Sequence, residues 1–413
     1  MPRNPQFASI DIGSTAIRVV VGQKREANES IQIIAASEHS SEGVARGIIT
    51  SIEDATGSIS AALEKCERMC GSPIETAVIG ISGSQALVNT SKGITAIAKA
   101  NGEISSEDVE RAIEAAEVVA VPPNYKLLHN IPKNFTVDGQ SGIKDPIGMT
   151  GSRLEVETQV IHCLSSHIEN VSKCATRAGV EISEMVLGIL AASEAVTTSR
   201  QRDLGVAVVN IGAQATNVAV YENGDLIHLG TIPVGGAHFT NDIAIGLRVS
   251  IDLAEKVKLG CGTVLPSDIS KHDEVDLSEF GAESLERVSH KHIAEILEAR
   301  SEELFSLVNK ELTKARRAGL LPAGVALTGG GSKLPGLAEA AKKDLKLPAS
   351  AGSVEVLTAV DKVNDPQFST AVGLILWTAK YSGYEGGRRF RIPFLSFGGM
   401  TDKVRKFVKT LMP

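Results

Sequence analysis

The sequence predicts a two-lobed α/β fold with a small inserted α+β domain and a C-terminal amphipathic helix. Near the N-terminus, FASIDIGSTAIRVVVGQ is typical of a strand, a tight Gly-Ser-Thr turn and a second strand. A similar phrase, LGVAVVNIGAQATNVAVYENGDLIHLG, returns about two hundred residues later, and its Asn223-Gly224 pair marks a turn into a third strand. This repetition predicts two related lobes, and 413 residues leave room for more than one domain.

Composition narrows the class of protein. With 43% apolar and 22% charged residues the chain is typical of a soluble globular protein, and no uninterrupted apolar stretch approaches the ~20 residues that span a bilayer. The N-terminus lacks the apolar core of a signal peptide, so we expect a cytoplasmic protein. A net charge of −7 argues against a general nucleic-acid binder.

The three glycine turns and the stretches between them predict the domain organisation. The expected divisions are a lobe 1 core at 1–83, an inserted α+β domain at 84–161, a return to lobe 1 at 162–195, a lobe 2 core at 196–235, a helical subdomain at 236–317, a further lobe 2 core at 318–368, a closing helix of lobe 1 at 369–384, a linker at 385–399 and an amphipathic helix at 400–413. Within the inserted domain we expect strands at 86–90, 93–98, 126–131 and 154–160, and a helix from 106 to about 118.

Phosphate binding is the chemistry that the glycine turns suggest. Successive backbone N–H groups in a tight turn can hold phosphate oxygens, and small residues such as Gly13, Ser14 and Thr15 allow close approach. Asp11 precedes this turn, where a carboxylate can hold a hydrated magnesium ion. An isolated Asp-Ile-Gly is more often only a turn. A second hairpin and the triple glycine at 329–331 make the set more specific, because two hairpins can clamp a triphosphate while the third turn approaches the nucleoside.

DIGST, NIGAQAT and LTGGGSKLPGL resemble the first phosphate, second phosphate and adenosine motifs of the actin, Hsp70 and sugar-kinase superfamily. Within it the chain is similar to the FtsA family over almost its whole length, in its inserted module and in phrases such as ILAASEAV, IPVGGAHFTNDIAIGL and STAVGLILW. The resemblance implies an actin-like, ribonuclease H-like fold that binds ATP and Mg at the seam between the lobes.

The resemblance also implies roles for individual residues. It places Gly13, Ser14 and Thr15 on one side of the phosphates, Gly212, Ala213 and Gln214 on the other, Glu255 and Lys258 at the ribose and adenine, and Gly329, Gly330, Gly331 and Ser332 around the adenosine. Without the resemblance, Glu255 and Lys258 at i and i+3 would be interpreted as a solvated salt bridge.

The second phosphate motif departs from the family pattern, which usually has acids where this chain has Asn210 and Asn217. An amide keeps the hydrogen bonds but cannot supply charge to a metal or an attacking water, so catalysis should suffer more than binding. Ala213 and Gln214 replace glycines, and we expect them to restrict the turn and crowd the γ-phosphate. At most a weak ATPase is predicted. Glu194 is the acid that we expect to orient a water; an exposed acid near a helix N-terminus is the alternative.

The C-terminal segment GGMTDKVRKFVKTLMP predicts a basic amphipathic helix that suits an anionic membrane surface. Packing of this helix on the body of the protein is the alternative. The residues expected at the membrane are Lys403, Val404, Lys406, Phe407, Val408 and Leu411.

The resemblance implies a cell-division protein that tethers FtsZ filaments to the cytoplasmic face of the inner membrane at the division site. It would bind the FtsZ C-terminal peptide on the helical subdomain, self-associate into filaments and help to recruit later division proteins, with no nucleic acid as partner. A pilus-assembly adaptor of the PilM type is the main alternative, and a sugar or acetate kinase is a weaker one. The length and the basic tail favour the FtsA family.

Overall fold

The computed structural model describes residues 6–25, 31–118, 121–282, 287–354, 356–358 and 360–382. The linker at 385–399, the amphipathic helix at 400–413 and its six membrane residues lie outside the described residues, so those expectations stay predictions. Among the residues that are described, no helix is long and apolar enough to cross a membrane.

Lobe 1 is built on a six-stranded sheet with the order β11-β6-β1-β2-β3-β19. Its strands are β1 (Gln6–Ile12), β2 (Ala16–Lys24), β3 (Ile31–Ser40), β6 (Thr76–Ile81), β11 (Glu181–Leu187) and β19 (Leu357–Thr358). The other elements of this lobe are the hairpin of β4 (Val44–Ala45) and β5 (Ile48–Ile49) and the helices α1 (Ile52–Cys70), α3 (Ser165–Arg177), α4 (Gly188–Val196) and α10 (Ser369–Ser382).

Lobe 2 repeats the same topology. Its sheet has the order β14-β13-β12-β17-β18, in which β12 pairs antiparallel with β13 and parallel with β17, as β1 pairs with β2 and β6. The strands are β12 (Val206–Ile211), β13 (Thr216–Glu222), β14 (Asp225–Ile232), β17 (Val325–Thr328) and β18 (Ala349–Ala351). The remaining elements are α5 (Ser199–Leu204), α6 (Gly236–Leu247), α7 (Ile251–Cys261), β15 (Glu274–Asp276), β16 (Arg287–Ser289), α8 (His290–Lys314) and α9 (Leu337–Leu345).

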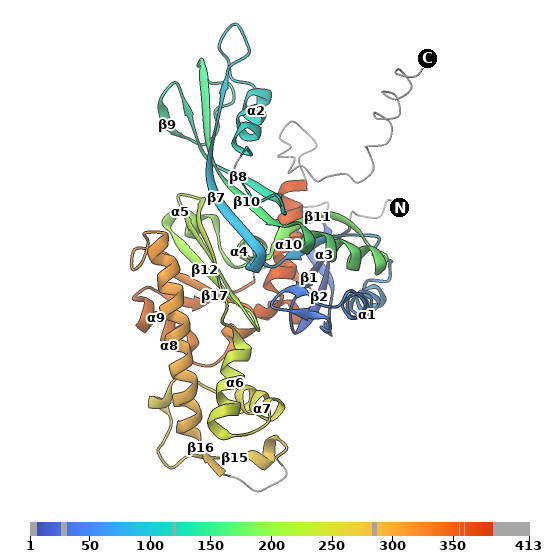
Figure 1. Cartoon of the computed structure of the whole chain (residues 1–413), viewed down its shortest axis with the longest axis vertical. Coiled ribbons are helices and arrows are strands. Elements are labelled where there is room, and N and C mark those ends of the chain that lie inside the picture. Colours follow the sequence, from blue (N-terminus) through green and yellow to red (C-terminus); the bar gives the residue numbers. More distant parts are fainter. Residues whose placement is uncertain are drawn as a thin grey trace.

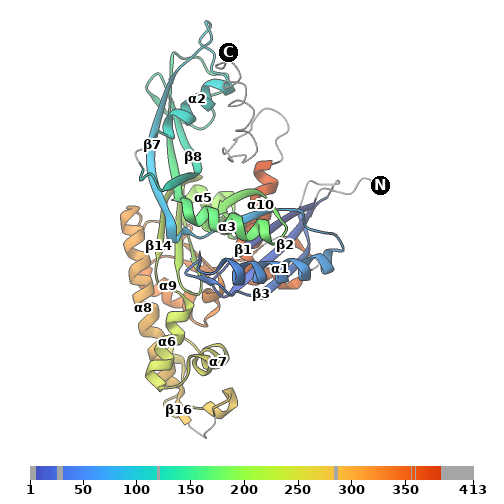
Figure 2. The same ribbon diagram turned by 45° about the vertical axis from the view of Figure 1, so that its right-hand side comes forward.

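A third sheet, with the order β7-β10-β8-β9, forms a module of its own with helix α2 (Ser106–Ala116). Its strands are β7 (Ala86–Ala96), β8 (Tyr125–Val137), β9 (Gln140–Ile143) and β10 (Arg153–Leu164). It has an apolar core of its own around α2, whereas Leu128 of β8 and Ile161 and Cys163 of β10 belong to the core of lobe 1. Figures 1 and 2 show this module at one end of the molecule and helices α6 to α8 at the other.

The expectation of two short strands at 86–90 and 93–98 was wrong, because β7 is continuous. Gly93, where the second strand was expected to begin, lies within β7 and makes room for helix α2. A Cβ atom there would lie 1.8 Å from the Ala112 carbonyl oxygen. The strand expected at 126–131 is also longer, and β9 was not foreseen.

Helices α4 and α10 pack together at the junction of the two lobes (Figure 1). Helix α4 also contacts β12, β13 and β17 of lobe 2, so it packs against the sheets of both lobes. The α4–α10 contact is close because Gly373 has no side chain: a Cβ atom there would lie 1.9 Å from the Ala191 carbonyl oxygen. Gly373 therefore lets the two helices approach closely where the lobes meet.

His129 on β8 lies where the inserted module meets lobe 1. Its Nε2 accepts a hydrogen bond of 3.0 Å from the Leu187 N–H at the end of β11, and its ring lies 5.6 Å from the ring of Trp377 on α10. Burial lowers the pKa of His129 to about 3, since the charged imidazolium would lose its hydration. On the lobe 2 side, Lys144 and Asp225 form an ion pair of 2.6 Å.

We predict that Gly373→Ala destabilises the protein by about 1–3 kcal/mol, because the added methyl group overpacks the α4–α10 contact. The measurement is the denaturation midpoint of the variant against the native chain. Gly57→Ala is the matched control, since Gly57 lies in α1 with nothing within 4 Å of its Cβ position. That helix-interior change should stabilise by about 0.5–1 kcal/mol. Equal effects of the two substitutions would contradict this account.

We further predict that acid lowers the free energy of unfolding because it favours protonation of His129, which is neutral when buried. The unfolded imidazole has its ordinary pKa of 6.5 and the folded one is depressed, so stability is full above pH 6.5 and falls toward pH 3. Between pH 7 and 5 the loss from this group is about 2 kcal/mol. In His129→Gln, which cannot titrate, the denaturation midpoint should vary less over this range. An unchanged pH dependence would contradict the prediction. His162 and His167, whose pKa values burial also lowers, account for part of the slope that remains.

Candidate functional site

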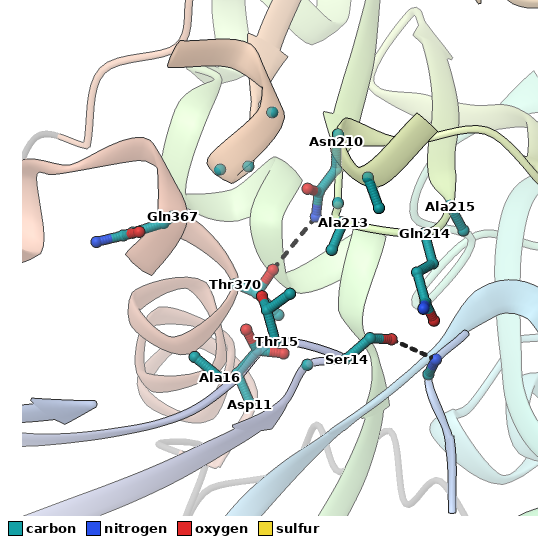
Figure 3. Close-up of a pocket in the computed structure, with 18 of the residues that line it drawn as sticks. Asp11, Ser14, Thr15, Ala16, Asn210, Ala213, Gln214, Ala215, Gln367 and Thr370 are labelled. Carbon is teal, nitrogen blue, oxygen red and sulfur yellow. Dashed lines mark hydrogen bonds between the residues drawn. The ribbon is translucent and has the colours of Figure 1, made fainter. Parts of the chain in front are cut away.

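Three glycine turns meet at one cavity between the lobes. The first two turns follow β1 and β12, which hold equivalent places in the sheets of the two lobes. The third turn follows β17, the strand that pairs parallel with β12. The cavity has a volume of about 700 Å³. Of the residues proposed from sequence, those that line it are Asp11, Gly13, Ser14, Thr15, Gly212, Ala213, Gln214, Glu255, Lys258, Gly329, Gly330 and Gly331. Figure 3 shows side chains of the first two turns facing each other across it.

The first two turns are closed in the same way. The Gly13 N–H donates to the Ala16 carbonyl at 3.1 Å, and the Gly212 N–H donates to the Ala215 carbonyl at 2.9 Å. The glycine N–H groups therefore hold the turns themselves.

Asp11 supplies a carboxylate at the lobe 1 side of the cavity. It pairs across β1 and β2 with Arg18, and within the described part of the chain no hydrogen bond reaches its carboxylate. Burial raises the pKa of Asp11 to about 6, against the opposing charge of Arg18. A part-buried carboxylate without a hydrogen-bond partner among the described residues fits a divalent cation. Since the described residues contain no group of three His, Cys, Asp or Glu ligands, such a cation would take its other ligands from water and phosphate.

At the equivalent place in lobe 2, the acid is replaced by an amide. Asn210 Nδ2 donates to the hydroxyl of Thr370 on α10 at 3.3 Å, which links the lobes (Figure 3). Asn217 Oδ1 accepts from the hydroxyl of Thr231 at 2.9 Å. Both amides are thus engaged in hydrogen bonds and add no negative charge to the cavity.

The expectation that Ala213 and Gln214 restrict the turn was wrong for the backbone, since neither has a positive φ. Gly235 and Gly236, at the start of α6, are what the turn requires. A Cβ atom on Gly235 would lie 2.5 Å from the Gly212 carbonyl oxygen, and the Gly236 N–H donates to that oxygen at 2.9 Å. The side chain of Gln214 leaves the turn toward residue 46, as described below.

Glu255 and Lys258 form an ion pair of 2.7 Å on α7. It is not a freely solvated pair: Lys258 Nζ also donates to the hydroxyl of Thr240 at 2.8 Å and to the Gly236 carbonyl at 3.2 Å, and Thr240 contacts Glu255. Only 12% of the Lys258 side chain is exposed. These bonds fix α7 against α6 and hold both charged groups at the cavity.

The triple-glycine turn packs directly on the second phosphate turn. Gly329 has a φ of +84°, and a Cβ atom there would lie 2.3 Å from Asn210 Oδ1. On Gly331 it would lie 2.4 Å from Cγ2 of Ile211. Gly330 faces open space. Ser332 does not line the cavity; its hydroxyl donates to the Gly329 carbonyl at 2.7 Å and so stabilises the turn.

Glu194 is not brought to the cavity. It lies in the last turn of α4, where its carboxylate pairs with Arg202 at 2.7 Å and Lys380 at 3.2 Å. Burial alone would raise the pKa of Glu194, but hydrogen bonds and charge from Arg202 and Lys380 lower it below its usual range. The alternative of an exposed N-terminal acid is wrong as well, since 13% of the side chain is exposed and the nearby helix end is the C-terminal one. The geometry gives Glu194 an ion-pairing role between α4, α5 and α10.

Several lining residues were missed from sequence. They are Arg18, Glu38, Arg46, Gly47, Gly80, Gly83, Gln367 and Thr370 among others. They belong to elements far apart in the chain and carry no local motif. The hairpin of β4 and β5 is the largest omission, because it contacts both phosphate turns.

Comparison with known proteins agrees with this architecture. A family model of the cell division protein FtsA matches residues 207–373, and a model of the SHS2 domain inserted in FtsA matches residues 83–162. Among solved structures, the PilM–PilN type IV pilus biogenesis complex superposes with a TM-score of 0.67 at 16% identity, covering 90% of this chain and 98% of that chain. MreB5 of Spiroplasma citri bound to ADP gives a TM-score of 0.55 at 15% identity, with 93% and 99% covered. Both likenesses show the actin-like fold.

Relatives at higher identity carry one description. The cell division protein FtsA of Bacillus subtilis (strain 168) is 36% identical over 396 residues, which cover 95% of this chain and 88% of that protein. FtsA of Pseudomonas aeruginosa is 34% identical, covering 90% and 88%, and FtsA of Escherichia coli (strain K12) is 30% identical, covering 89% and 88%. The chain therefore belongs to the FtsA family of cell division proteins.

Proposed function

We propose that this cell-division protein binds ATP with Mg in the cavity between its lobes and uses the nucleotide as a clasp or assembly switch, with slow or no hydrolysis. The observation that supports it most directly is the meeting of three glycine turns, the part-buried carboxylate of Asp11 and the Glu255–Lys258 pair around one cavity. In this proposal Gly13, Ser14 and Thr15 face the phosphates from lobe 1.

The rest of the nucleotide would be held from lobe 2. Gly212, Ala213 and Gln214 would contact the phosphates. Gly329, Gly330 and Gly331 would surround the adenosine. Ser332 would contribute indirectly, because its hydroxyl donates to the Gly329 carbonyl and stabilises the turn. Asp11 would hold the metal through water. The bound magnesium supplies charge neutralisation for the phosphates, and the chain's own residues bind and orient them.

Slow turnover follows from the charges at the cavity. Of the lining carboxylates in the described part of the chain, Glu38 pairs with Arg18 at 3.6 Å and Glu255 pairs with Lys258 at 2.7 Å, which leaves Asp11. Asn210 and Asn217 cannot take a proton from water. A cavity with binding groups, in which the carboxylates other than Asp11 are engaged in ion pairs, favours retention of the nucleotide over hydrolysis.

We further propose that the protein tethers FtsZ filaments to the cytoplasmic face of the inner membrane at the division site. The basic residues and apolar residues from Lys403 to Leu411 would bind anionic lipid, at about 1 kcal/mol per basic residue near the surface. The FtsZ C-terminal peptide would bind the helical subdomain, where Ile245 of α6 and Ile251 of α7 are exposed by 75% and 61%. Self-association into filaments and recruitment of later division proteins complete the proposal.

A PilM-type adaptor is less well supported. That likeness is 16% identical and concerns the fold, whereas relatives at 30–36% identity are cell division proteins. A kinase role would need a further acid at the cavity that is free to act, and among the described residues the lining carboxylates of Glu38 and Glu255 are engaged in ion pairs.

We predict that Asn210→Asp raises the rate of phosphate release about tenfold or more, because a carboxylate beside Thr370 can bind metal or activate water. Phosphate release with saturating Mg–ATP is the measurement, with ATP affinity determined in parallel. Asn223→Asp, in the β13–β14 turn away from the cavity, is the matched control and should leave the rate unchanged. Brisk hydrolysis by the native chain would defeat the clasp proposal.

We predict that the native chain carries FtsZ polymers into the pellet with anionic liposomes, and that a chain ending before Met400 does not. The deletion removes the basic and apolar residues that would bind lipid, while FtsZ binding in the absence of liposomes should persist. Lys403→Glu with Lys406→Glu should weaken lipid binding, whereas Lys342→Glu with Lys346→Glu, an equal charge change at exposed positions of α9 and its C-cap, should not. Retention of the shortened chain on liposomes would count against the tether.

A further inference from the structure

The β4–β5 hairpin contributes a third wall to the cavity, and its loop is Arg46-Gly47. Both loop residues have positive φ, at 54° and 70°. A two-residue hairpin loop of this kind favours Asn-Gly, and a non-glycine residue with left-handed backbone costs roughly 1–2 kcal/mol. Arginine at the first position is therefore disfavoured by the backbone, which indicates a functional role for its side chain.

The loop is tied to both phosphate turns. The Gly47 N–H donates to the Ser14 hydroxyl at 2.8 Å, and the Arg46 N–H donates to Gln214 Oε1 from the other lobe. The Arg46 carbonyl accepts from the Ser84 hydroxyl at 3.1 Å. In Figure 3, Ser14 and Gln214 lie at the opposite edge of the view from Gln367. Arg46 is thus fixed beside the tips of the two phosphate turns.

The charge of Arg46 is not used elsewhere in the described part of the chain. The other cations that line the cavity have carboxylate partners: Arg18 pairs with Glu38, Lys258 with Glu255 and Lys333 with Asp365. Arg46 is exposed and forms no ion pair among the described residues. Arg46 lines the cavity from a loop whose backbone contacts both turns, and a guanidinium carried there is suited to a multiply charged phosphate group.

We propose that Arg46 recognises the terminal phosphate of a bound nucleoside triphosphate and so makes the cavity discriminate triphosphate from diphosphate. The inference rests on the proposed nucleotide binding and adds its specificity. Because the Arg46 N–H also donates to Gln214 of lobe 2, binding of a triphosphate by Arg46 affects a contact between the two lobes. The residue is outside the three glycine motifs, and it acts by contact with the ligand.

The test compares affinities for a non-hydrolysable ATP analogue and for ADP, both with Mg, by displacement of a fluorescent nucleotide. Arg46→Gln should lose about tenfold in affinity for the ATP analogue and at most twofold for ADP. Arg46→Gly should lose the same preference although it relieves the backbone, which separates the guanidinium from the turn conformation. Gln214→Ala should show a smaller loss in the same direction.

Arg248→Gln is the matched control. Arg248 is also exposed, also has a left-handed backbone (φ 58°) and does not line the cavity, so both affinities should be unchanged. An equal loss of both nucleotides in Arg46→Gln, or no loss, would overturn the inference and leave the proposed function intact. Failure of the native chain to bind either nucleotide would overturn both.

Discussion

The close packing of helix α4 against α10 is the contact on which the site depends. The backbone of Gly373 lies against the Ala191 carbonyl, so the two helices approach more closely than side chains would allow. Helix α4 begins immediately after β11 of lobe 1 and packs on β12, β13 and β17 of lobe 2. Helix α4, held by α10, thus contacts the sheets of both lobes. The turns after β1 and β12 face one cavity because the sheets are held in that orientation.

Because the two lobes share one topology, each places a glycine turn at the cavity. The residues that differ between the two turns give the two sides of the cavity different charges. Asp11 and Asn210 occupy equivalent positions, each two residues before the first glycine of a turn. The lobe 1 copy retains a part-buried carboxylate, and its desolvation raises the pKa of Asp11 to about 6. The lobe 2 copy has an amide that bonds to Thr370. A symmetric backbone thus carries an asymmetric charge, which suits a site that holds a nucleotide more readily than it hydrolyses it.

The fold and the glycine turns could be predicted because they depend on local rules. A strand, a small-residue turn and a second strand are visible in fifteen or so residues, and glycine is needed where Gly329 meets Asn210. Gly93 shows the limit of that reasoning: nothing in the local sequence indicates that a neighbouring helix requires glycine at this position.

Side-chain direction was the part that sequence could not supply. The AASEAV phrase pointed to Glu194, yet its carboxylate faces Arg202 and Lys380 instead of the cavity. Conversely, Arg46, Gln367 and Thr370 reach the cavity from separate elements. Their positions follow from how the lobes pack, which no motif encodes.

The contacts between the lobes differ on the two sides of the seam, and this difference explains how a nucleotide could act as a clasp. On the α4 side the join is buried and apolar, and the Glu194–Arg202 ion pair reinforces it. At the cavity the join is made of separate polar contacts, Arg46 with Gln214 and Asn210 with Thr370. Polar contacts of this kind exchange with water at low net cost, while a buried apolar join does not. Opening would therefore occur about α4, and a ligand bridging the phosphate turns would act where the lobes are held least strongly.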